Sequence, residues 1–432
     1  MAPAPCTERA TFRLRHNVVN DQQPSEATAA ALGAESLEET AEQRRLALGL
    51  ISGCHTLNHL QYSITSVMFP VMMTDLGFGL LQLGMLSAIS NFVGQGLQVI
   101  YGFIAGFFKR TVVLGIGNVI IGLSAMAQFF VGSYPQLLAA RVAIDAGSSP
   151  QHPLGASILS RYFPQARGWA LTFHHSAGSL GSFLGPALAS IALLYMGWKT
   201  AFVVFGVLSL VMGMTLFVLR DHASAAEETR TKKSNFKANL NAYKICLKNR
   251  NILFTSLVLM VGAAGRGTGI NITYLVPFFM ERFGITASAG GLVLTVLQAA
   301  GLVGPLAIAW FSDRFGQRPL ITQVTLLLSA VMSVWLAHHT SMGMLFYLNL
   351  ILYGAVVEAR SSLTQTMIAD FARADLTDAA FSIYYFVGCI SGPIWTLIVG
   401  YVMQRHGFTT AFYLAASTYL AGMLLLLFVK DK

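Results

Sequence analysis

The sequence predicts an all-α membrane protein with twelve transmembrane helices in two pseudo-symmetric six-helix halves. Of its 432 residues, 54% are hydrophobic and 11% are charged, and the mean hydropathy is +0.60. A soluble domain has about 25% charged residues. Twelve stretches are apolar over the roughly 20 residues that a helix needs to cross a bilayer. One long hydrophilic connection, residues 220–250, divides them into six and six.

The predicted spans follow the apolar runs of the chain. They are 46–70, 79–105, 111–131, 136–160, 166–195, 200–219, 252–279, 287–310, 319–337, 342–368, 379–402 and 408–429. Residues 1–43 are polar and mixed in charge, without the basic start and apolar run of a signal peptide, so we expect a disordered cytoplasmic tail. The expected domains are this tail, a half at 44–219, a cytoplasmic loop at 220–250 and a half at 251–432.

The basic residues predict the orientation. Placing both termini in the cytoplasm puts nineteen lysine and arginine residues of the loops and ends on the cytoplasmic side. The opposite side keeps three, Lys199, Arg282 and Arg405. Because basic residues gather in cytoplasmic loops, we expect this topology, in a bacterial inner membrane. The net charge of +9 then needs no nucleic-acid partner.

The soluble segments carry no recognisable reaction centre. They show no pair of nucleophile and base, no phosphate-binding loop and no metal-ligand spacing, so we do not expect an enzyme. The four cysteines lie far apart, which predicts neither a disulfide framework nor a zinc site. We therefore expect no cofactor.

The two halves repeat each other at an offset of 207 residues. The stretch GSFLGP at 181–186 recurs as GCISGP at 388–393, and the same offset carries Gln151 onto Glu358 and His59 onto Arg266. Such duplication is typical of transporters built from repeated halves. Small residues spaced by four allow close helix packing, so these six residues form a candidate packing motif: Gly181, Gly185, Pro186, Gly388, Gly392 and Pro393.

The loop between the eighth and ninth spans carries the clearest motif. Its candidate gating residues are Asp313, Arg314, Gly316 and Arg318. Together with the twelve spans and the basic central loop, they resemble the major facilitator superfamily and its loop motif G-x-x-x-D-R-x-G-R-R. The corresponding first-half loop departs from this pattern, because Gly106 and Phe107 replace the aspartate and the arginine.

Within that superfamily, three segments are similar to fosmidomycin-resistance-like exporters: Asn58-His59, residues 152–157 and residues 178–186. The last of these also resembles the glycine-proline motif of antiporters. The resemblance implies an exporter of the drug:proton antiporter branch, with the first, fourth, seventh and tenth spans lining a central cavity.

These four spans carry polar residues at the depth where transporters bind substrate. The candidates for substrate binding are His55, Asn58, His59, Arg141, His152, Arg266, Asn271 and Arg360. Two intramembrane carboxylates, Asp145 and Glu358, are the candidates for proton coupling, since protonatable groups in this setting are typical proton carriers.

The fourth span contains a charged stripe. Arg141 and Asp145 are four residues apart and share a helix face, to which His152 returns after three turns. Whether the charged pair touches the cargo or only neutralises itself is open at this point. We expect Pro150 and Pro153 to break the helix and to free backbone groups for a cavity.

Partners are also expected for the remaining polar groups. Glu358 and Arg360 are two apart, a poor spacing for a mutual pair, so Arg266 is the natural partner of Glu358. His174 and His175 are adjacent and face different directions, so at most one should reach the cavity.

The balance of charge predicts the cargo. Three intramembrane arginines face two carboxylates, which makes the cavity neutral to positive. Arginine binds carboxylate or phosphonate oxygens with a planar fork. We expect a monomeric secondary active transporter that moves a small organic anion or anionic amphiphile by alternating access, coupled to protons and in the export direction.

Two alternatives remain. The cargo is a transition metal or metal chelate if His55, His59, His152 and one of His174 or His175 converge as ligands. The protein is a non-transporting receptor or assembly scaffold if the tail and the central loop are docking sites. A structural reading of His55 and His59, as hydrogen-bonded links between helices, is equally open.

Overall fold

The computed structural model describes residues 41–104, 108–219, 236–262, 264–265, 269–373 and 376–430. The predicted tail lies outside this part of the chain except for residues 41–43, which begin the first helix. Residues 44–432 form one compact unit, and the description below concerns that unit.

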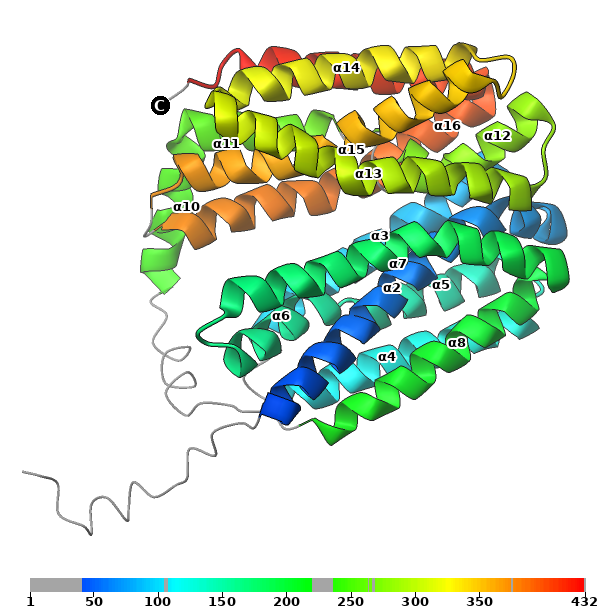
Figure 1. Ribbon diagram of the computed structural model, residues 1–432, viewed down its shortest axis with the longest axis horizontal. Coiled ribbons are helices and arrows are strands. Elements are labelled where there is room, and N and C mark those ends of the chain that lie inside the picture. Colours follow the sequence, from blue (N-terminus) through cyan, green and yellow to red (C-terminus); the bar gives the residue numbers. More distant parts are fainter. Residues whose placement is uncertain are drawn as a thin grey trace, which may run out of the picture. The chain divides into compact units, whose positions relative to one another are not determined.

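The first half contains helices at each of the first six predicted spans (Figure 1). They are α2 (Ala41–Leu76), α3 (Leu80–Ile104), α4 (Arg110–Ala127) with a 3-10 turn (Gln128–Phe130), α5 (Tyr134–Ser148), α6 (Gln151–Tyr162), α7 (Arg167–Tyr195) and α8 (Trp198–Thr215) with a 3-10 turn (Leu216–Val218). Helices α5 and α6 share the fourth span.

The second half begins after the central loop. Its elements are α11 (Arg250–Val261), the π-helix η3 (Ile270–Tyr274), α12 (Leu275–Phe283), α13 (Ala287–Phe315), α14 (Arg318–His338), α15 (Met344–Phe371) and α16 (Thr377–Leu426). Within the predicted loop, α10 (Phe236–Lys248) packs against α11 and α16. Helix α16 covers two predicted spans, separated at Gly407, whose φ of 78° and ψ of 173° suit a residue without a side chain.

The fourth span is interrupted at Pro150. Helix α5 ends at Ser148 and α6 begins at Gln151, so the expected break is present. Pro153 contributes to the same interruption, because its missing N–H is the one that would donate to the carbonyl oxygen of Ser149 in a continuous helix. It is the third residue of α6, in the first turn, where backbone N–H groups have no partner within the helix and proline is tolerated.

The seventh span is not the continuous helix that was predicted over 252–279. Helix α11 ends at Val261, and the π-helix begins at Ile270, whose N–H donates to the carbonyl oxygen of Ala264 at 3.0 Å. Non-helical backbone at membrane depth is tolerated where protein or a cavity surrounds it. We therefore expect the non-helical backbone after Val261 to be surrounded by other helices of the second half or to line a cavity.

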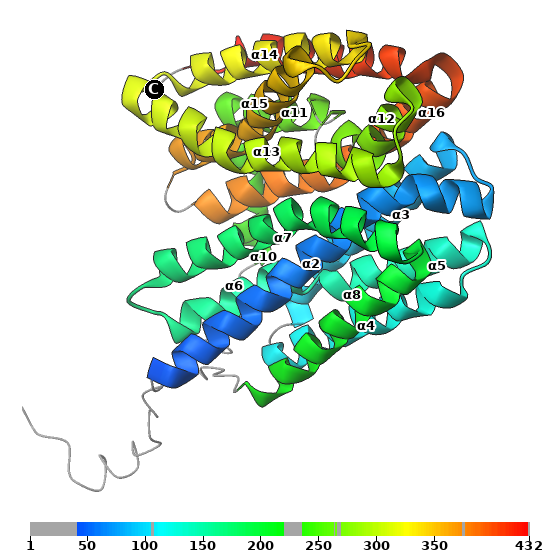
Figure 2. The same ribbon diagram turned by 45° about the vertical axis from the view of Figure 1, so that its right-hand side comes forward.

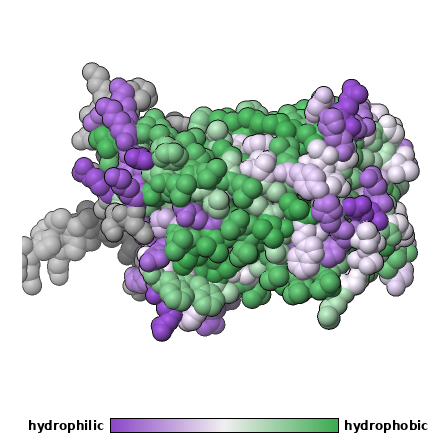
Figure 3. All heavy atoms as spheres, turned by 90° about the horizontal axis from the view of Figure 1, so that it is seen from above, coloured by the Kyte–Doolittle hydropathy of each residue, from purple (hydrophilic) through white to green (hydrophobic). Residues whose placement is uncertain are grey.

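Six of the described helices are long and apolar enough to cross a membrane by length and composition. They are α4, α7, α8, α13, α14 and the larger part of α16. The first, fourth, seventh and tenth spans fall outside this group because they are interrupted or carry more polar residues. The outer surface agrees with a bilayer: Figure 3 shows apolar side chains across the middle of one face and hydrophilic residues toward its ends.

The two halves meet at one end of the bundle (Figures 1 and 2). Helix α3 packs against α16, and α7 packs against α13. The Tyr274 hydroxyl lies 3.0 Å from the carbonyl oxygen of Thr396 and 3.4 Å from that of Leu80 in the other half. A Cβ atom on Gly84 or Gly400 would collide with this hydroxyl. We call these five residues the contact layer.

Candidate functional site

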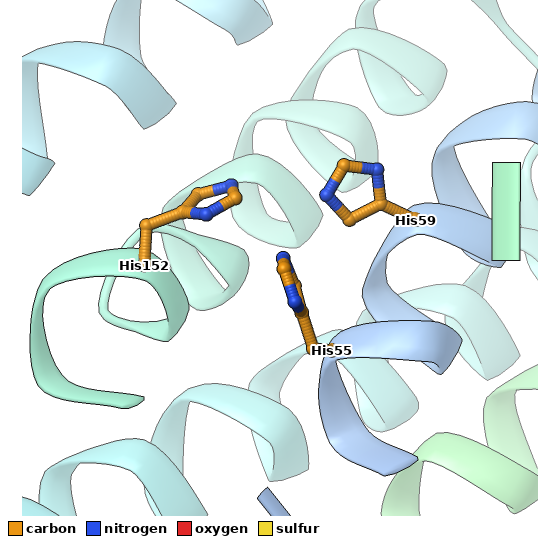
Figure 4. Close-up of side chains that lie close together, drawn as sticks. All are labelled: His55, His59 and His152. Atoms are coloured by element: carbon orange, nitrogen blue, oxygen red, sulfur yellow. The ribbon is translucent and has the colours of Figure 1, made fainter. Parts of the chain in front are cut away.

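Three imidazole rings converge in the first half (Figure 4). His55 and His59 lie one turn apart on α2, and His152 is the second residue of α6. The ring centroid of His55 lies 4.7 Å from that of His59 and 4.8 Å from that of His152. One nitrogen from each ring lies within 4.8 Å of the others.

The buried histidine of this group is held in one orientation. Nδ1 of His55 lies 2.8 Å from the backbone carbonyl oxygen of His174, and His55 is 1% exposed. A carbonyl oxygen only accepts, so Nδ1 carries the hydrogen and Nε2 keeps its lone pair. Nε2 is buried with no hydrogen-bond partner among the described residues. Nδ1 of His59 lies 3.0 Å from the hydroxyl oxygen of Ser182.

Helix α7 is shaped around the His55 ring. A Cβ atom on Gly178 would lie 2.7 Å from Cε1 of His55, so a glycine is needed there. His174, one turn earlier on α7, stacks on His55 with the ring centroids 4.1 Å apart. His174 is 1% exposed, whereas its neighbour His175 is exposed. The two adjacent histidines therefore point in different directions.

The Arg141–Asp145 pair forms as the spacing suggests. Nη2 of Arg141 lies 3.3 Å from Oδ1 of Asp145, and Nη1 donates to the hydroxyl of Thr65 on α2 at 3.0 Å. Oδ2 of Asp145 is buried without a hydrogen-bond partner in the described part of the chain. Arg141 also lines a small cavity between the halves with Ser90 of α3 and Thr273 of η3.

The residues of the charged stripe on the fourth span thus contact two different parts of α2. His152 faces the histidines of α2, while Arg141 contacts Thr65, which lies six residues beyond His59 and so about 9 Å further along that helix. The histidine group and the charged pair are neighbours along α2 rather than one contact cluster.

In the second half, Asn271 links the candidate residues. Its side-chain amide donates to Oε1 of Glu358 at 3.4 Å and accepts from the Tyr353 hydroxyl at 2.7 Å. Arg266 lies outside the described residues, so the expected pair with Glu358 has no structural description. Glu358 is partly exposed.

The Arg360 side chain contacts the end of α11. Its Nη1 donates to the carbonyl oxygens of Val258 and Leu259, at 3.2 and 3.3 Å, and the side chain is 1% exposed. These carbonyls belong to the last turn of α11, where that of Val258 also accepts from the N–H of Gly262 at 3.0 Å. The described contacts of Arg360 therefore stabilise the end of a broken helix.

Asn58 faces the other helices of its half. Its amide donates to Oδ1 of Asn118 on α4 at 2.9 Å and to the Cys54 carbonyl at 2.8 Å. Gln151 continues this network by donating to the carbonyl oxygen of Ile51 at 3.0 Å. Asn58 thus belongs to a polar link between α2, α4 and α6.

The loop motif joins three helices of the second half. Nη2 of Arg318 donates to Oδ1 of Asp313 at 2.7 Å, and Nη1 bonds to Asp370 of α15. Gly316 ends α13 with a φ of 68°, and Arg314 is exposed. The counterparts in the first half, Gly106 and Phe107, lie outside the described residues.

The glycine-proline motif packs helices in both halves. On α7, a Cβ atom on Gly181 or Gly185 would collide with α2. On α16, a Cβ atom on Gly388 would lie 3.0 Å from Leu259 of α11. Pro186 and Pro393 lie inside their helices, and Gly392 lies in the same segment as Gly388.

Five partners were not predicted: Thr65, Asn118, Ser182, Tyr353 and Asp370. Each is an ordinary polar residue whose role depends on which helix it faces. Ser182 alone had a signal, because it lies inside the GSFLGP motif that packs against α2.

Two six-helix halves around buried polar groups define the class of secondary membrane transporters. The chain matches the Major Facilitator Superfamily over residues 51–396, with a second match over 267–432, and it belongs to that family. It is an integral, multi-pass membrane protein that binds small molecules and is not an enzyme. The predicted fold and family are confirmed.

Individual relatives agree with this membership. The "Probable L-galactonate transporter" of Escherichia coli (strain K12) is 20% identical over 396 residues, 86% of this chain and 86% of that protein. The "Fosmidomycin resistance protein" of the same organism is 23% identical over 275 residues, 63% of this chain and 66% of that protein, as the resemblance predicted.

Solved structures share the fold. An inward-facing, unoccupied bacterial homolog of the human lysosomal transporter Spinster matches with a TM-score of 0.69 at 16% identity. The match covers 90% of this chain and 95% of that chain.

Proposed function

We propose that this transporter moves a small organic anion, or an amphiphile with an anionic head, across a bacterial inner membrane by alternating access. The observation that carries the proposal is Arg141: it is 3% exposed, lies at membrane depth and lines a cavity where both halves meet. That cavity is about the size of one water molecule, so an anion enters it only when the halves move apart. A buried cation at that place is costly unless it binds an anion. Asp145 contacts it through one oxygen at 3.3 Å, longer than the usual charged hydrogen bond.

The name of one relative supports an anionic cargo. That protein is called an L-galactonate transporter, and galactonate carries a carboxylate. In this chain, Arg141 and Arg266 are the proposed anchors for such a group. Arg360 contributes to the positive field from a position at the end of α11.

The proposed transport cycle uses the contact layer. With both termini in the cytoplasm, as the basic residues predict, the contact layer closes the outer end and the structure faces inward. Opening that end requires Tyr274 to leave Gly84 and Leu80. Substrate bound between the halves then has access to the other side of the membrane.

We further propose proton coupling and export by a monomer. Asp145 and Glu358 carry the proton: the first sits beside the anion anchor and the second is partly exposed. An anion that binds Arg141 competes with Asp145 for the same guanidinium. The charge state of Asp145 therefore couples proton binding to anion binding at Arg141.

Flux measurements on purified protein test the proposal. Protein in vesicles is offered a panel of aldonates, uronates and other small anions, with a neutral sugar as control. Anion flux that falls in Arg141→Ala and Arg266→Ala but not in Arg405→Ala supports the proposal. Flux of the neutral sugar equal to that of the anions overturns the proposal, and so does unchanged anion flux in both cavity variants. If no anion in the panel is transported, the scaffold alternative is favoured.

A further inference from the structure

We propose that His55, His59 and His152 bind one divalent transition-metal ion, with Zn²⁺ as the probe, through three imidazole nitrogens and with one coordination position open. This metal site is distinct from the Arg141 anchor and does not depend on the proposed anion transport. Imidazole is a preferred ligand of Zn²⁺, Cu²⁺ and Ni²⁺, whereas Mg²⁺ and Ca²⁺ prefer oxygen.

The geometry fits a metal ion after a small adjustment. One nitrogen from each ring lies within 4.8 Å of the other two. With Zn–N bonds of about 2.0–2.1 Å, ligand nitrogens around a tetrahedral ion are about 3.4 Å apart. Each pair therefore closes by about 1.5 Å or less, which rotation of the side chains supplies. Figure 4 shows the three rings turned toward one another from α2 and α6.

The hydrogen bonds at Nδ1 of His55 and His59 resemble those that orient histidine ligands in metal sites. A metal-bound histidine usually donates its other ring N–H to a backbone carbonyl or another polar group, which fixes the tautomer. His55 does this with the carbonyl of His174, so its free nitrogen is Nε2. The hydroxyl oxygen of Ser182, 3.0 Å from Nδ1 of His59, can accept the hydrogen of that nitrogen, which leaves Nε2 as the ligand nitrogen.

Buried ring nitrogens without a hydrogen-bond partner lie at this site and next to it, since both nitrogens of the adjacent His174 also lack one among the described residues. Nε2 of His55 is buried and has no hydrogen-bond partner among the described residues, although a buried polar atom without a partner is costly. A metal ion at the centre of the group would bind this lone pair. A helix-linking role would instead place a donor there.

Charge and access also suit a cation with a free position. Three neutral imidazoles leave the full double charge on the ion, so its open position attracts water or an anionic oxygen. His55 is buried, His59 is half-buried and His152 is exposed, so the group opens on one side. An ion can enter past His152 while His55 forms the floor.

The test is metal binding to the full chain in detergent, purified without a polyhistidine tag and stripped with a chelator. Zn²⁺ binding by calorimetry, and Co²⁺ absorption as a report of tetrahedral geometry, should give one ion per chain. Ser182→Ala removes a group that only supports a ligand, and it should weaken Zn²⁺ binding by roughly 10–100-fold. His59→Ala and His152→Ala each remove a ligand and should weaken binding by more than that. His175→Ala is the control and should bind normally, because His175 is exposed and its ring centroid lies 6.2 Å from that of His55, further than those of the two ligand rings.

The outcomes separate the possibilities. Saturable binding lost in both ligand variants but kept in His175→Ala supports the site, provided that all variants elute as folded monodisperse protein. If His152→Ala is unstable, His152→Gln replaces it. No saturable binding by the folded wild-type chain, or equal binding in His59→Ala and His175→Ala, overturns the proposal. Anion flux in the same preparations is read separately, so failure of one proposal leaves the other to its own test.

Discussion

The hydroxyl oxygen of Tyr274 occupies the space into which a Cβ atom of Gly84 would project. Tyr274 belongs to the π-helix of the second half and Gly84 to α3 of the first. The same Cβ atom would lie 3.0 Å from the carbonyl oxygen of Thr396. Close approach of the two halves at this end therefore requires a glycine at position 84.

Gly84→Ala should weaken the closed contact layer. Overpacking of this kind costs about 1–3 kcal/mol, and here only the closed state bears that cost. The population should shift toward the opposite state, measured as a longer spin-label distance between α3 and α16 at this end. Gly96→Ala on the same helix is the control, because a Cβ atom there meets nothing within 4 Å. Equal distances in both variants would contradict the assignment.

Arg141→Ala should abolish anion binding and also destabilise the fold. Removing one partner of a buried ion pair costs about 3–5 kcal/mol, because the other charge stays behind. The double variant Arg141→Ala/Asp145→Ala removes both charges and should recover much of the thermal stability. If the double variant also recovers anion binding, the pair is structural and Arg141 is not the anchor.

Glu358→Gln and Asp145→Asn should uncouple transport from protons. A side chain that cannot exchange a proton cannot carry one, so flux driven by a pH gradient should fall to the level without a gradient. Exchange of labelled for unlabelled substrate needs no net proton movement and should persist in at least one variant. Full gradient-driven flux in both variants would remove these residues from the coupling mechanism.

Arg360→Met should lower thermal stability more than it lowers anion affinity. The Leu259 carbonyl at the end of α11 loses its described side-chain donor, whereas that of Val258 keeps the N–H of Gly262. An unsatisfied buried group costs about 1–3 kcal/mol. Thermal unfolding and anion binding, measured on one preparation, separate the effects. A large loss of affinity at unchanged stability would instead place the guanidinium in the binding site.

Gly178→Ala should displace the His55 ring, because the new Cβ atom would lie 2.7 Å from its Cε1 atom. Stability should fall by about 1–3 kcal/mol, and Zn²⁺ affinity should fall with it. Gly168→Ala, at the start of α7, is the matched control, since nothing lies within 4 Å of its Cβ position. Normal Zn²⁺ binding in Gly178→Ala would argue against His55 as a ligand.

Several local features were predictable from the chain alone. The pair of Arg141 and Asp145 follows from their spacing on one helix, and the interruption at Pro150 follows from the missing backbone N–H. The break in the seventh span was missed although glycine occupies positions 262, 265, 267 and 269, a density that disfavours a helix.

Contacts between helices were much harder to predict. The sequence placed Asn58 and Arg360 beside the cavity because they lie on cavity-lining spans. Their described contacts go instead to Asn118 of α4 and to the last turn of α11. A side chain on such a span can point inward or toward a neighbouring helix, and one sequence does not show which helix is its neighbour.

The sequence by itself determined the class of protein, the number of spans, the division into halves and the family, because hydropathy, charge and loop motifs are local properties of the chain. Only the tertiary structure decided that His55, His59 and His152 converge, that Ser182 and a backbone carbonyl orient them, and that Arg360 turns away to α11. Those outcomes depend on how helices distant in sequence pack, and packing fixes which polar groups come within bonding distance.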